Sequence, residues 1–88
     1  MPSVHVSLPA ALTSPEPPVV LDCEGETVAE ALRAAGAQVP RYAQRIFYGD
    51  RLLVSVVVNG RHLAPADALT TALAAGDLVG VMPPVAGG

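Results

Sequence analysis

The sequence predicts an α+β domain in which one main helix covers one mixed sheet of four to five strands. Three observations support this class: two segments near the N-terminus alternate apolar and polar residues, a capped amphipathic helix follows, and strand-like segments separated by turn signals fill the second half. The chain has 88 residues, of which 51% are apolar, so it has the length and composition for one domain with one core.

The first two strands are predicted to form an antiparallel hairpin. Their alternating apolar residues are Val4, Val6 and Leu8 in the first strand and Val19, Leu21 and Cys23 in the second. A register with His5 opposite Asp22 places all six on one face and leaves no polar residue among them. The segment from Pro9 to Pro18 contains four prolines and is predicted to be a connecting loop.

The main helix is predicted to begin at Thr27. Thr27 and Glu30 have the spacing of a capping box, in which the threonine oxygen accepts from the third backbone amide and the glutamate reaches back. The next apolar residues form one stripe at helical spacing, namely Val28, Ala31, Leu32 and Ala35. Gly36 is predicted to end the helix in the left-handed conformation.

The middle of the chain has weaker signals. Residues 40–44 are predicted to form a turn of helix, and residues 48–51 a turn. Residues 52–58 are apolar at nearly every position and rich in β-branched side chains, which predicts a central strand covered on both faces.

Turn signals divide the last third of the chain. Asn59-Gly60 is a strong hairpin signal, residues 64–75 are predicted to contain one helical turn, and Gly76-Asp77 is predicted to be a turn. Residues 78–82 are the last predicted strand, which the prolines at 83 and 84 end because proline cannot donate to a sheet.

The predicted order is β-β-α-β-β-β, which is the β-grasp architecture. A strand–helix–strand passage implies a right-handed crossover, so two strands run parallel. We therefore expect a β-grasp domain over residues 1–82 and a flexible extended tail over residues 83–88.

The tail sequence Pro83-Pro84-Val85-Ala86-Gly87-Gly88, joined to this order and to the Asn59-Gly60 and Gly76-Asp77 turns, resembles the ubiquitin-like sulfur-carrier family. That family includes the small subunit of molybdopterin synthase, the thiamine sulfur carrier and an actinobacterial carrier for cysteine synthesis. The resemblance implies that an E1-like enzyme adenylates the Gly88 carboxylate with ATP and that sulfur transfer leaves a thiocarboxylate. A sulfur-accepting biosynthetic enzyme would then use that thiocarboxylate.

The residue types of the tail suit that chemistry. Glycine at positions 87 and 88 passes a narrow channel and lets enzyme backbone approach the reacting carbon. Pro83 and Pro84 favour an extended start and reduce the ordering cost on binding. We expect Gly88 and Gly87 to be the reacting end. The residues expected to contact partners are Met82, Pro83, Pro84, Val85, Ala86, Gly87 and Gly88.

Two other functions use the same features. The chain could be a protein modifier that is conjugated through Gly88, or a β-grasp interaction module with an inert tail. Within the sulfur-carrier hypothesis, the chain length and the Pro-Pro-Val-Ala-Gly-Gly ending favour the molybdopterin and cysteine types over the thiamine type. In each case we expect that the chain is not itself an enzyme and that partners supply the chemistry.

Composition argues against several other classes. The net charge of −3 and the absence of an arginine cluster give little basis for nucleic-acid binding, and no apolar run is long enough to span a membrane, so the cytoplasm is expected. His5 and His62 are too few for a metal site, and no bound cofactor is expected.

Three further side-chain expectations concern the surface and the core. Cys23 is expected to be a buried structural cysteine because it alternates with apolar residues. The arginines at 41, 45 and 61 are expected to form a solvated face. Met82 has two alternatives, either an exposed contact residue at the root of the tail or a core residue.

Overall fold

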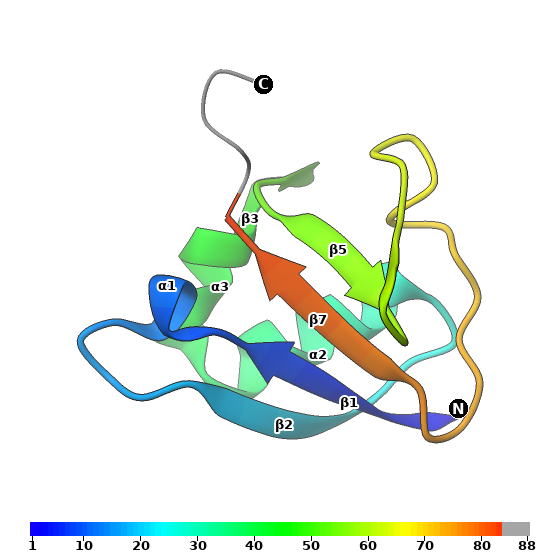
Figure 1. Ribbon diagram of the computed structural model, residues 1–88, viewed down its shortest axis with the longest axis horizontal. Coiled ribbons are helices and arrows are strands. Elements are labelled where there is room, and N and C mark those ends of the chain that lie inside the picture. The colour runs from blue at the N-terminus through cyan, green and yellow to red at the C-terminus, as the bar shows by residue number, and fades with distance from the viewer. Residues whose placement is uncertain (84–88) are drawn as a thin grey trace.

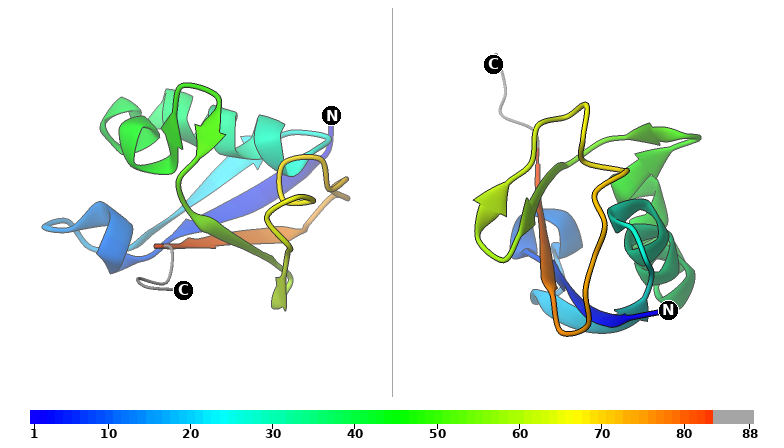
Figure 2. Two further views of the ribbon diagram at one scale, coloured as in Figure 1. Left: turned by 90° about the horizontal axis from the view of Figure 1, so that it is seen from above. Right: turned by 90° about the vertical axis from the view of Figure 1, so that its right-hand side faces the viewer.

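A computed structural model of the chain describes residues 1–83 and has two layers, a five-stranded mixed sheet and the helices on one of its faces (Figures 1 and 2). The elements in chain order are β1 (Ser3–Leu8), α1 (Ala10–Thr13), β2 (Val19–Glu24), α2 (Val28–Gln38), α3 (Pro40–Ile46), β3 (Phe47–Tyr48), β4 (Arg51–Leu52), β5 (Ser55–Val58), β6 (Arg61–His62) and β7 (Leu78–Met82). The main sheet has the order β2-β1-β7-β5-β6, and β3 pairs separately with β4.

The predicted β-grasp architecture is confirmed. β1 and β2 are antiparallel with His5 opposite Asp22, as the alternation of apolar residues predicts. β1 and β7 pair in parallel at the centre of the sheet, and β7 is antiparallel to β5. These pairings make β2 and β5 run in the same direction on either side of the central pair, as expected for a crossover through α2.

The start of α2 is confirmed. The Glu30 amide donates to Thr27 Oγ1 at 3.3 Å, as a capping box requires. The Glu30 carboxylate, however, accepts from the amide of Glu26 at 2.8 Å, one residue before the expected donor. All four residues of the predicted apolar stripe are buried against the sheet, namely Val28, Ala31, Leu32 and Ala35.

The predicted end of this helix is wrong. α2 continues through Gly36 to Gln38, and Gly36 is buried. A Cβ at Gly36 would lie 3.0 Å from the Cβ of Ala43, so the glycine allows α3 to pack closely on α2. The turn of helix expected at 40–44 is real but longer, because α3 extends to Ile46. Pro40 begins α3, where its missing amide proton costs nothing.

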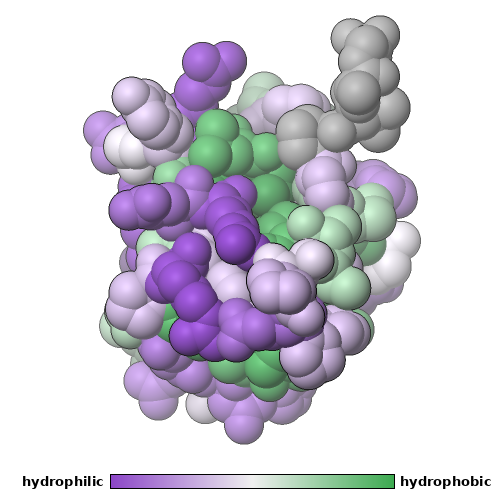
Figure 3. Space-filling view, turned by 90° about the vertical axis from the view of Figure 1, so that its left-hand side faces the viewer, coloured by the Kyte–Doolittle hydropathy of each residue, from purple (hydrophilic) through white to green (hydrophobic). Residues whose placement is uncertain are grey.

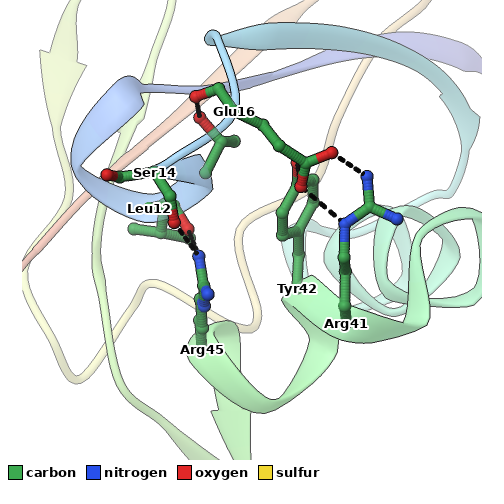
Figure 4. A network of polar contacts seen from close by, with 7 residues as sticks. Leu12, Ser14, Glu16, Arg41, Tyr42 and Arg45 are labelled. Atoms are coloured by element: carbon green, nitrogen blue, oxygen red, sulfur yellow. Dashed lines mark hydrogen bonds and ion pairs between the residues drawn. The ribbon is translucent and has the colours of Figure 1, made fainter.

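The predicted loop from Pro9 to Pro18 contains the one-turn helix α1. The arginines at 41, 45 and 61 are exposed, as the sequence predicts, and those at 41 and 45 also bind this segment (Figure 4). Arg45 Nη1 donates to the carbonyls of Leu12 and Ser14. The sequence places these partners about 30 residues apart, so local patterns could not reveal the contact.

The single strand predicted over residues 52–58 is two strands. β4 ends at Leu52, the Leu53 amide donates to the Ile46 carbonyl at 2.8 Å, and β5 begins at Ser55. The helices cover only one face of the main sheet, so Val56 is buried whereas Val57 is half-buried. Residues 64–75 form turns and no helix, with the amides of Thr70 and Thr71 donating to the Asp67 carbonyl.

Candidate partner-docking site

The exposed residues of the candidate site begin at the end of β7. Val79 and Val81 point into the core and are 0% and 2% exposed, whereas Met82 is 39% exposed. Met82 is therefore exposed and not a core residue, and its contact with a partner stays a prediction. Pro83 is also exposed. The end of β7 thus presents an apolar side chain to solvent at the point where the sheet stops.

The remaining predicted site residues lie outside the residues that the structure describes. They are Pro84, Val85, Ala86, Gly87 and Gly88. The expected extended tail over 83–88 therefore stays a prediction. What the structure does fix is the position of Met82, which is opposite Ser55 of β5.

The face of the sheet that carries Met82 has no helix on it (Figure 2). Leu78 and Gly80 of β7 lie on the same face, and Leu78 is 45% exposed. Val20 of β2 is 59% exposed. Between them, His5 Nδ1 lies 2.7 Å from Asp22 Oδ1. The result is an open face in which apolar side chains from β2 and β7 flank one polar pair.

Hydrogen bonds from the side chains of Asn59 and Asp77 fix the start of β7. Asn59 Oδ1 accepts from the Leu78 amide at 2.9 Å, and Asn59 Nδ2 donates to Asp77 Oδ1 at 3.0 Å. Asp77 Oδ2 accepts from the Ala74 amide at 2.8 Å. The bond from the Ala74 amide, followed by that from Asn59, lowers the pKa of Asp77 because both stabilise the carboxylate. Asp77 is therefore a turn residue, as predicted.

A second polar network joins the α1 segment to α3 (Figure 4). Glu16 forms a bidentate pair with Arg41 and accepts from the Tyr42 hydroxyl at 2.9 Å. The bond from Arg41, and then that from Tyr42, lowers the pKa of Glu16. Figure 3 shows this side of the molecule, where hydrophilic side chains form a band beside an apolar area.

The other predicted chemical groups are not assembled into a reactive site. Cys23 is buried, as predicted, and burial followed by the charge of Asp22 raises the pKa of its thiol. Within residues 1–83, no three His, Cys, Asp or Glu side chains are grouped closely enough to hold a metal ion. None of the helices in that part of the chain combines the length and hydropathy needed to cross a membrane.

Sequence reasoning missed two exposed apolar residues, Val20 and Tyr48. The alternation that turns Val19 and Leu21 toward the core already places Val20 on the open face, so the signal for Val20 was present. Tyr48 is 78% exposed and lies in the two-stranded β3–β4 hairpin. A two-residue strand has no periodicity, so nothing in the sequence indicated which way this ring points.

Comparison with known proteins identifies the family. The sequence profile of the ThiS family matches residues 11–88. The chain belongs to the ThiS family. This ThiS-family protein is 41% identical over 64 residues to small archaeal modifier protein 3 of Haloferax volcanii, and the match covers 70% of each chain.

Solved structures agree with this assignment of the ThiS-family protein. Small archaeal modifier protein 1 of Methanosarcina acetivorans is 28% identical, with a TM-score of 0.75 over 100% of this chain and 98% of that one. CysO of Mycobacterium tuberculosis is 26% identical, with a TM-score of 0.73 over 93% and 99% of the two chains. The predicted membership of the ubiquitin-like sulfur-carrier family is confirmed.

Proposed function

We propose that this chain is a sulfur carrier whose Gly88 carboxylate is adenylated and then converted to a thiocarboxylate. The observation that carries the proposal is the match of the ThiS profile through residue 88, which includes the diglycine. The proposal requires a free carboxylate at Gly88.

The chemistry follows from the poor reactivity of a carboxylate. ATP reacts with the Gly88 carboxylate to give an acyl-adenylate and pyrophosphate. A hydrosulfide ion then attacks the acyl carbon and AMP leaves, so one carboxylate oxygen is exchanged for sulfur. If the sulfur comes from a persulfide, a second thiol cleaves the acyl disulfide that forms, supplies the two electrons and leaves as a disulfide with the donor. An E1-like partner supplies ATP binding and catalysis, and the carrier supplies the acyl group. The carrier itself needs no bound cofactor for this role.

The described part of the chain supports the role of a handle. The domain has its own apolar core, and Met82 and Pro83 are exposed at the end of a central strand. The strand before the tail is paired with β1 as far as Gly80 and with β5 as far as Met82. The anchored strand would hold the tail in one direction while the residues beyond it enter a partner enzyme.

The sulfur acceptor is proposed to be a biosynthetic enzyme of the molybdopterin or cysteine type. This rests on the likeness to CysO and on the length of the chain between α2 and β5. A complex that contains CysO and BexX has been solved for Amycolatopsis orientalis, and one of its chains is 26% identical with a TM-score of 0.73.

A second candidate function is conjugation to proteins through Gly88. The relative from Haloferax volcanii is named a small archaeal modifier, and that observation favours it. An acyl-adenylate serves either function, because a sulfur donor and a target amine attack the same carbon. The outcome depends on which nucleophile the partners deliver.

Incubation with an E1-like adenylating enzyme, ATP and a sulfur donor tests the proposal. We expect the intact mass to rise by the difference between one sulfur and one oxygen, and a variant that lacks Gly87 and Gly88 to remain unchanged. Covalent adducts with other proteins would instead support the modifier function. If the wild type is neither loaded nor conjugated by enzymes from its own genome, the chain is an interaction module and the proposal fails.

A further inference from the structure

The basic side chains of this chain are all arginine. The sequence contains five arginines and no lysine. The two residue types differ chemically, because a lysine amine can lose its proton and attack an acyl carbon, whereas a guanidinium stays protonated and is not a nucleophile. An acyl-adenylate or a thioester at Gly88 reacts with any accessible amine. The side chains of the chain therefore offer no amine to its own activated end.

The fold requires arginine at some of these positions but not at all of them. Arg41 binds the Glu16 carboxylate through two nitrogens, and the guanidinium carbon of Arg33 lies 3.8 Å from the centre of an aromatic ring. Lysine reproduces neither geometry. Arg51 and Arg61 are exposed, and within residues 1–83 their side chains form no hydrogen bond or ion pair. Lysine at position 51 or 61 would therefore leave the fold intact.

The thiol of Cys23 is enclosed by the core. Cys23 is 4% exposed, and its partner across the β1–β2 pair is the fully buried Val4. Burial raises the pKa of the thiol, and the charge of Asp22 raises it further. A thiol must ionise to attack an acyl carbon, so Cys23 is a poor acceptor. Hydroxyl groups are weak nucleophiles unless a neighbouring base activates them, and an acyl group on histidine is lost to water.

The amino end of the domain lies far from the end of β7. Figure 1 shows it beside the start of that strand, because β1 and β7 are parallel. Ser3 is level with Gly76, whose amide donates to its carbonyl at 2.8 Å, and Gly76 is six residues before Met82. At about 3.3 Å per residue, Ser3 is roughly 20 Å from Met82, and Met1 lies beyond it. The six residues after Met82 span at most about 20 Å, so an α-amine on Met1 is out of reach of Gly88.

We propose that the domain is inert toward its own activated tail, so that the acyl group of Gly88 passes only to nucleophiles that partners deliver. The inference rests on the proposed function, and it applies to sulfur transfer and to conjugation alike. In sulfur transfer, the activated carrier is not consumed by self-acylation. In conjugation, carriers are attached singly, because the side chains of one copy offer no amine to the Gly88 of another.

A lysine at position 51 would be within reach of the activated end. Met82 is opposite Ser55, about 5 Å away, and the four residues from Arg51 to Ser55 span at most about 14 Å. The tail can bridge that combined distance. In Arg51→Lys, the lysine nitrogen would bond to the Gly88 carbonyl carbon. The leaving group would depart with the electron pair of its bond, and the proton of the amine would go to solvent.

The test uses the 88-residue protein with a thioester of 2-mercaptoethanesulfonate at Gly88. The thioester stands for the activated acyl group and needs no adenylating enzyme. By intact mass spectrometry at mildly alkaline pH, we expect the wild type to give only the free acid. Arg51→Lys is expected to give a product lighter than the free acid by one water and to lose its thioester roughly tenfold faster or more. After trypsin, peptide 46–61 should remain joined to peptide 62–88.

Arg51→Gln is the matched control, because it removes the charge without adding an amine, and it should behave as the wild type. A wild-type product that is lighter by one water, or a covalent dimer of the wild type, would overturn the inference. Hydrolysis alone in Arg51→Lys, while free lysine added to the solution is acylated, would also overturn it, since an amine on the domain would then make no difference. If adenylating enzymes fail to activate the wild type, the proposed function alone is overturned.

Discussion

Gly25 lies between β2 and α2 at a place where a side chain has no room. A Cβ there would lie 2.6 Å from the backbone nitrogen of Ala31, and a backbone atom cannot move aside as a flexible side chain can. We therefore expect Gly25→Ala to lower the free energy of unfolding by about 1–3 kcal/mol. Chemical denaturation of the two proteins measures this difference.

Gly80 provides the matched control for that substitution. A Cβ at Gly80 would lie 3.7 Å from the Val57 carbonyl oxygen, which is ordinary contact. Gly80→Ala is expected to be neutral or slightly stabilising, because alanine loses less backbone entropy in a strand. Equal changes in the free energy of unfolding for the two substitutions would show that the close contact at Gly25 does not cause the loss of stability.

The carboxylate of Asp77 makes stability depend on pH. Its pKa is lowered in the folded protein, so its contribution is fully present above the ordinary pKa of about 3.9 and is lost as pH falls through the lowered value. We expect Asp77→Asn to have a lower Tm than the wild type near neutral pH. The gap should shrink in strong acid, and thermal melts across pH measure it. A gap that is constant with pH would contradict the bonding of Asp77 that the structure shows.

At the scale of residues, the sequence was most informative where burial alternates regularly. The register of β1 and β2 and the buried stripe of α2 follow from apolar spacing alone. Gly36 was misread because glycine has two uses at a helix, as a left-handed stop and as a small surface for close packing. Only the position of Ala43 distinguishes them, and that position is set by tertiary structure.

At the scale of elements, the α1 segment depends on contacts from α3. The two carbonyls bound by Arg45 would lose their donors in Arg45→Met. We expect faster amide hydrogen exchange over residues 10–16 and a loss of about 1 kcal/mol in the free energy of unfolding. Arg61→Met is the control, since Arg61 is exposed on β6. Equal exchange in the two variants would mean that Arg45 does not hold the segment.

The elements that were predicted wrongly share one physical cause. Residues 9–18 are shaped by Arg45, about 30 residues away in the sequence, and residues 52–58 by the bond from the Leu53 amide to the Ile46 carbonyl. Residues 52–58 also have the composition of a strand throughout, so nothing local indicated the break between β4 and β5. Strong turn signals such as Asn59-Gly60, where both residues have positive φ, were read correctly.

At the scale of the whole molecule, the sheet topology explains how the exposed residues of the last strand could be predicted from the sequence. β7 is central and pairs in parallel with β1 as far as Gly80 and antiparallel with β5 as far as Met82. The alternation of Val79 and Val81 with Leu78 and Met82 decides which side chains face outward. The apolar cavity beside Ser55 was not predictable, because its wall combines residues 52–56 with residues 63–69.

Sulfur is proposed to be loaded on Gly88, and the competing acceptor within the chain is the thiol of Cys23. Trypsin separates the two, because Arg61 is the last basic cleavage site and Cys23 lies before Arg33. After loading, mass spectrometry of peptide 62–88 is predicted to show one oxygen replaced by sulfur. Peptide 1–33 is predicted to be unchanged. Sulfur added to peptide 1–33, with peptide 62–88 unmodified, would contradict the account.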